Sequence, residues 1–251
     1  MTAPRFVRRN RGTGHSYTLD GAPVPGVTTV LGVMAKPALV NAAARVAAAY
    51  AGDEWSTLAE LPTSERVELI AKAHERKWYG KRERGTRIHT FGALLAAGTT
   101  VDVPEELAGP VDAYARFLDR WDMEPVATEC PVVHTTYGYA GTFDAIVSSP
   151  KLGGVVLLDI KTGGVFKESA LQLAAYRNAT HYLDAGELET MPATVAAYVA
   201  KVGPDDVELV PVAADEHTFA AFLYLLAVYR WNLDYAADAV GQTVYPEAVA
   251  S

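Results

Sequence analysis

The sequence predicts an α/β fold with a mixed central sheet flanked by helices, preceded by an N-terminal helical region. Apolar residues recur about every 3.6 positions in the first half of the chain and about every two from Pro125 onward. The apolar run 155–161 ends in polar residues, as expected for a buried central strand that reaches a site. A chain of 251 residues, 50% of them hydrophobic, can bury one sizeable core but hardly two full enzyme domains.

The N-terminal region is expected to open with a short strand or arm and a hairpin-like turn at Leu19-Asp20-Gly21. The proline-punctuated segment 23–30 is expected to be extended. Helices follow, because the apolar spacing becomes helical and Pro37 can occupy a first turn. They are predicted at 39–51, from Thr63 to a break at Gly80 or Gly85, at about 86–97 ending at Gly98, and at 104–121.

The second half is expected to form the sheet. Its predicted strands are 126–134 paired with 137–147 through a Thr135-Thr136 turn, then 155–161, and finally 194–201 paired with 207–212. Helices are predicted at about 167–184 and 215–233.

The formal net charge of -8 argues at first against a nucleic-acid partner. Its distribution reverses that argument, because residues 72–89 carry seven Lys and Arg against two Glu, and 5–11 carry four Arg. Both clusters are predicted to hold a DNA backbone; the alternative for the first is a solvated helix face. Trp78 and Tyr79 beside it are interpreted as helix packing rather than as platforms for an unpaired base.

A single cysteine, Cys130, excludes a disulfide framework and a four-thiolate metal site within the chain. The start of the chain has no apolar run of signal-peptide length, and no stretch approaches a membrane span. A soluble, cytoplasmic protein is expected.

Strand alternation places Asp159 and Lys161 on one face of their strand, with Ile160 pointing into the core. Asp144 follows an apolar-flanked segment on the neighbouring strand and is expected to lie opposite Asp159. Two adjacent carboxylates repel unless a hard divalent cation such as Mg²⁺ lies between them. A bare D-x-K would more often be a surface ion pair, so the wider pattern decides the interpretation.

That pattern includes Gln172 and Tyr176, which are four residues apart and therefore share one face of the next helix. Taken singly, each would be an ordinary helix residue. Glu129 is interpreted as an exposed strand glutamate and is left outside the expected site.

Four motifs together resemble the RecB-like branch of the PD-(D/E)xK nuclease superfamily. They are G-T-F-D at 141–144, L-L-D-I-K-T-G at 157–163, Q-L-A-A-Y at 172–176, and the upstream G-T-R-I-H at 85–89. The segments V-T-T-V-L-G at 27–32 and K-P-A-L at 36–39 are also similar to the N-terminal region of bacteriophage exonucleases of this superfamily.

The resemblance implies a restriction-endonuclease-like core over residues 85–251, including the C-terminal helix. Residues 1–84 would form an N-terminal arm and accessory helical region of the same globular unit. The resemblance implies Mg²⁺ or Mn²⁺ as cofactor. No iron-sulfur cluster is expected, because Cys130 is the single cysteine. The implied metal ligands are His89, Asp144, Asp159 and the Ile160 carbonyl; Lys161 would assist the attacking water, while Gln172 and Tyr176 would line the substrate strand as further catalytic residues.

The expected function is a metal-dependent DNA exonuclease acting from DNA ends in recombination, repair or replication, encoded by a phage and present in the host cytoplasm. Arg82, Arg84 and Arg87 are the expected DNA-binding residues. The alternatives are a structure-specific endonuclease and an inactive nuclease-like module that binds DNA ends or a helicase. A single-strand annealing protein or helicase as partner, and a homo-oligomer, remain open from sequence.

Overall fold

The computed structural model describes residues 5–11, 14–96, 99 and 102–243. Its centre is a five-stranded sheet in the order β12-β11-β8-β7-β4. β8 and β11 are parallel and the other neighbours are antiparallel, so the sheet is mixed. The strands are β4 (Glu124–Thr128), β7 (Ala145–Ser149), β8 (Gly154–Lys161), β11 (Ala196–Val202) and β12 (Val207–Val212).

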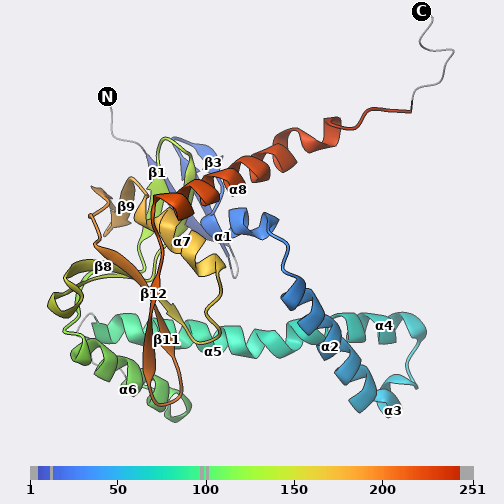
Figure 1. Cartoon of the computed structure of the whole chain (residues 1–251). Coiled ribbons are helices and arrows are strands. Elements are labelled where there is room, and N and C mark those ends of the chain that lie inside the picture. Colours follow the sequence, from blue (N-terminus) through green and yellow to red (C-terminus); the bar gives the residue numbers. More distant parts are fainter. Residues whose placement is uncertain (1–4, 12–13, 97–98, 100–101, 244–251) are drawn as a thin grey trace, which may run out of the picture.

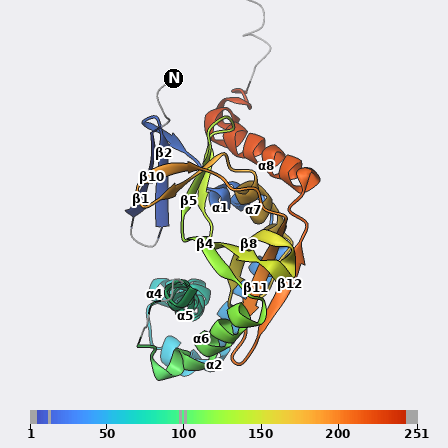
Figure 2. The ribbon, with the colours of Figure 1, turned by 90° about the vertical axis from the view of Figure 1, so that its left-hand side faces the viewer.

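Helices cover both faces of this sheet, which confirms the predicted α/β class (Figures 1 and 2). One face packs against α5 (Ala73–Ala96) and α6 (Glu105–Arg120), and the other against α7 (Glu168–Arg177) and α8 (Glu216–Asp234). The sequence of β8 is continuously apolar because both faces of this strand are buried. Leu158 packs in the core on the α5 and α6 side, and Leu157 packs in the core on the α7 and α8 side.

Two smaller sheets complete the fold, in the orders β10-β9-β5-β6 and β1-β2-β3. A buried cluster that includes Phe6, Tyr17, Val133 and Ala140 joins them. The strands are β1 (Phe6–Arg11), β2 (Gly14–Leu19), β3 (Ala22–Val24), β5 (Pro131–His134), β6 (Tyr139–Thr142), β9 (His181–Asp184) and β10 (Glu187–Thr190). The β2–β3 turn at Asp20-Gly21 has φ values of 51° and 84°, which confirms the predicted hairpin.

The remaining helices lie before α5 in the chain. α2 and α4 pack on the N-terminal part of α5, away from the sheet (Figure 1). The helices before α5 are α1 (Val27–Val30), α2 (Pro37–Asp53), α3 (Trp55–Leu58) and α4 (Thr63–Ala71). Short 3₁₀ turns occur before and after α5, at η1 (Leu31–Val33), η2 (Pro150–Leu152) and η3 (Ala236–Asp238). Pro37 opens α2 as predicted.

Four expectations about these elements were wrong. The long strand pair 126–134 with 137–147 divides between two sheets, because Glu129 takes a left-handed φ of 53° that bends the chain out of β4. The helix expected at 167–184 ends at Arg177, and a hairpin with a left-handed Ala185-Gly186 turn follows. Residues 27–30 are helical rather than extended.

The fourth concerns α5, which continues through both Gly80 and Gly85. The boundary expected at residue 84 therefore falls inside one unbroken helix. Gly98, the expected end of the 86–97 helix, lies outside the described residues.

Among the described helices, none alone is long and apolar enough to cross a membrane. Only the bent pair Val27–Val33 and Pro37–Asp53, which meet at 85°, would pass on length and composition together.

Candidate active site

The candidate site lies at the carboxyl end of β8. Asp159 is 2% exposed, and its Oδ1 lies 2.9 Å from Nζ of the half-buried Lys161. Ile160 between them points into the opposite core. This is the alternation that the sequence predicted, and it directs an acid and an amine to the same face of the sheet.

Asp144 lies beside Asp159. The last paired positions of β7 and β8 are Ala145 and Leu158, so Asp144 and Asp159 occupy the next opposed positions and share a face. Oδ2 of Asp144 accepts a hydrogen bond from the Ile160 N–H at 2.6 Å. Exclusion of water raises the pKa of the Asp144 carboxyl group, while the Lys161 charge and the Ile160 N–H lower it.

Helix α7 brings the predicted amide and phenol to this face. Gln172 Nε2 donates to the Tyr176 hydroxyl at 3.2 Å. Burial raises the pKa of Tyr176, the Gln172 hydrogen bond lowers it, and the charges of Asp144 and Asp159 raise it further. The phenol is therefore protonated at neutral pH and close enough to both carboxylates to feel their charges.

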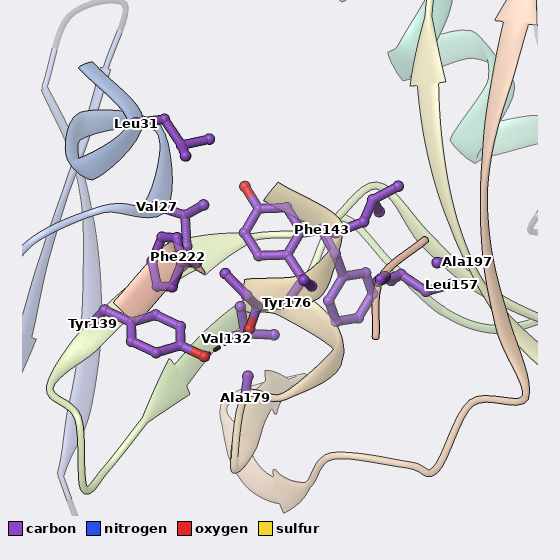
Figure 3. Close-up of a cluster of buried hydrophobic side chains, with 14 of the residues drawn as sticks. Val27, Leu31, Val132, Tyr139, Phe143, Leu157, Tyr176, Ala179, Ala197 and Phe222 are labelled. Atoms are coloured by element: carbon purple, nitrogen blue, oxygen red, sulfur yellow. Dashed lines mark hydrogen bonds between the residues drawn. The ribbon is translucent and has the colours of Figure 1, made fainter. Parts of the chain in front are cut away.

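Gly141 explains why the first motif begins with glycine. A Cβ at this position would lie 2.4 Å from Cε1 of Tyr176, closer than atoms can approach. Tyr176 is 3% exposed and packs in the cluster that includes Val27 and Phe143 (Figure 3). The strand can therefore pass this ring only without a side chain.

Two residues near the site were not predicted from sequence. Glu129 lies opposite Asp144, because Thr128 pairs with Ala145 and the Glu129 N–H donates to the Asp144 carbonyl at 2.8 Å. Glu129 is exposed, as expected, but it follows strand β4 instead of lying within that strand. Partial loss of hydration and the Asp144 charge raise its pKa to about 7, against the lowering effect of Arg8. Buried Tyr114 of α6 also has a raised pKa, from burial first and then from Asp144 and Glu129.

The N-terminal sheet borders the site as well. The Tyr17 hydroxyl lies 3.0 Å from Oγ1 of Thr142, two residues before Asp144. Arg8 is the register partner of Tyr17, and its guanidinium lies 2.9 Å from a ring nitrogen of His15. The sequence predicted a basic arm but gave no signal that Arg8 would lie close enough to Glu129 to lower its pKa.

Helix α5 approaches the site at Gly85. A Cβ there would lie 2.9 Å from Oγ1 of Thr162, the residue after Lys161. Position 89 follows one turn later on the same face of the helix, but the His89 side chain lies outside the described part of the structure.

The expected DNA-binding arginines differ from one another. Arg84 is exposed. Arg87 pairs with Glu106 of α6 at 3.1 Å, so part of its charge is compensated within the protein. The Arg82 side chain falls outside the described residues.

Within the described ranges, no three His, Cys, Asp or Glu side chains are positioned together to hold a metal ion. Asp144 and Asp159 are two of the expected ligands, and His89 would be the third side chain. No family model and no curated protein sequence matches this chain.

Proposed function

We propose that this chain is a metal-dependent DNA exonuclease that hydrolyses phosphodiester bonds from DNA ends. The proposal includes a restriction-endonuclease-like core and a phage-encoded member of the RecB-like branch. The observation that carries it is the meeting of the Asp144, Asp159 and Lys161 side chains at one end of the central sheet, beside the Gln172–Tyr176 pair.

The donor atoms fit a hard divalent cation. Two carboxylates at opposed positions of neighbouring strands, with the carbonyl of Ile160, the residue after Asp159, would supply the oxygen ligands that Mg²⁺ and Mn²⁺ prefer. His89 would add one nitrogen. When bound, the ion lowers the pKa of water and offsets charge at the phosphate.

The protein's own side chains would orient the attacking water and hold the substrate. Lys161, 2.9 Å from Asp159, would orient the attacking water and balance the charge that develops on the phosphate oxygens. The protonated Tyr176 hydroxyl and the Gln172 amide would hold the substrate strand. Arg8 and Arg84 would contact backbone phosphates, which would make binding sensitive to salt.

The test is digestion of end-labelled linear and closed circular duplex DNA with Mg²⁺, Mn²⁺ or EDTA. Wild type is compared with Lys161→Ala and with Lys151→Ala, since Lys151 is also an ion-paired lysine but lies in η2, at the other end of β8. Loss of linear DNA only, abolished by EDTA, is expected. Lys161→Ala should lower the rate about 10²- to 10⁴-fold, and Lys151→Ala should not.

Other outcomes separate the alternatives. Equal cutting of circles would identify an endonuclease. DNA binding without cutting under any metal condition would refute the proposed activity and favour an inactive DNA-end module.

A further inference from the structure

Helix α8 carries two apolar faces, and only one of them packs against the fold. Phe222 and Leu226 are buried in the core beside α7. The opposite face carries Tyr224, Val228 and Trp231, and Tyr235 is the capping residue directly after the helix; these four are 74%, 47%, 50% and 61% exposed. Their spacing of four, three and four residues aligns them along one side of the helix. We call these four residues the α8 stripe.

The end of α8 that bears most of the stripe projects beyond the rest of the fold (Figure 1). None of the four stripe residues is charged, and the spacing matches the seam of a coiled coil. The nearby Arg230 lies on another side of the helix and donates to the backbone carbonyls of Tyr137 and Gly138. The Arg230 charge therefore does not stand between the stripe and a second helix.

We propose that the α8 stripe is the contact surface between two copies of this chain, whose α8 helices pack antiparallel across a twofold axis. A twofold axis near residues 229 and 230 places Tyr224 against the partner's Tyr235 and Val228 against the partner's Trp231. In the Val228–Trp231 pair a small side chain then faces a large one, as close packing requires. In a parallel pair, Trp231 would face the partner's Trp231 and Val228 would face the partner's Val228. The two tryptophans would then clash, and the two valines would leave a gap.

The available area agrees with a reversible dimer. At about 200 Å² for an aromatic side chain, the exposed parts of Tyr224, Trp231 and Tyr235 offer roughly 370 Å² per copy. Two copies would bury about twice that from aromatics alone. Val228 and the exposed Ala221 and Ala227 bring the total to about 1,000 Å², the lower limit for a specific interface.

The experiment measures the mass of the full chain by sedimentation velocity and by light scattering after size exclusion, over a wide range of concentrations. Mass should rise from one copy to two as concentration increases. Trp231→Glu should raise the dissociation constant tenfold or more, because it puts a charge against the partner's Val228. Trp55→Glu is the control, since Trp55 is 54% exposed but lies on α3.

Tyr224→Ser provides a second, milder variant, and circular dichroism verifies that each variant keeps its fold. Tyr224→Ser should also weaken the dimer. A monomer at every concentration would overturn the proposal, as would a dimer that Trp231→Glu and Tyr224→Ser leave intact. DNA cleavage is measured separately, so neither result bears on the proposed nuclease activity.

Discussion

Two glycines in the same helix make a matched pair for testing how α5 meets the site. A Cβ at Gly80 would meet nothing within 4 Å, whereas a Cβ at Gly85 would lie 2.9 Å from Oγ1 of Thr162. Gly80→Ala should therefore gain the helix propensity of alanine, about 1 kcal/mol. For a chain of this size that corresponds to a rise in Tm of about 2–4 °C.

Gly85→Ala gains the same propensity but forces Thr162 or the helix to move. Thr162 is exposed and can turn its hydroxyl away, at a cost of about 0.5–1.5 kcal/mol for a strained rotamer. The gain in helix propensity and the cost of the strained Thr162 rotamer nearly cancel, so Gly85→Ala should be about 1 kcal/mol less stable than Gly80→Ala. Because Thr162 follows Lys161 directly, DNA cleavage should fall in Gly85→Ala and stay unchanged in Gly80→Ala.

Thermal melts and initial cleavage rates of both variants provide the measurement, and a third variant tests the cause. Gly85→Ala combined with Thr162→Ala removes the close contact and should recover the stability of Gly80→Ala. Equal stability and equal activity of Gly80→Ala and Gly85→Ala would refute the reasoning. So would a double variant no more stable than Gly85→Ala.

Three further changes test the site. Gly141→Ala should cost about 3 kcal/mol or more in urea unfolding, because the Tyr176 ring 2.4 Å from the new Cβ is enclosed and cannot move aside; a loss under 1 kcal/mol would contradict that packing. In EDTA, Glu129→Gln should stabilise the protein at pH 8 more than at pH 5. A carboxyl pKa raised from 4.5 to about 7 favours the folded state below pH 4.5, and this contribution is lost as pH rises through 7. This contribution to the free energy of unfolding would be about 3 kcal/mol in an enclosed site and about 1 kcal/mol for this exposed side chain. Equal stabilisation by Glu129→Gln at pH 5 and pH 8 would refute it. Finally, Mg²⁺ should raise the Tm of wild type but not of Asp144→Asn, and equal rises would place the ion elsewhere.

Features set by local spacing were predictable from sequence. The alternation in 155–161 identified the central strand and the shared face of Asp159 and Lys161, and the four-residue interval placed Gln172 beside Tyr176. Both inferences need only the period of a strand or a helix. The roles of these residues stay predictions.

Features set by distant contacts were not predictable. The Tyr17–Thr142 contact joins residues 125 positions apart, and nothing near either residue indicates the other. Glu129 was interpreted as part of a strand because propensity gives no warning of a left-handed φ in glutamate. A helix break was expected at Gly80 or Gly85, whereas α5 continues through both and the missing side chain of Gly85 serves packing against Thr162.

The electrostatics of the site argue that its carboxylates are kept for a reason other than stability. Burial raises the pKa of Asp144, of Glu129 and of the two buried tyrosines, Tyr114 and Tyr176, and the Asp144 charge raises the pKa of the last three further. Each raised pKa of a carboxylate means that its charged form lowers the free energy of unfolding at neutral pH. A core built for stability would hold neutral side chains here. The arrangement is consistent with the proposed divalent cation, which would convert unfavourable carboxylate charge into binding energy.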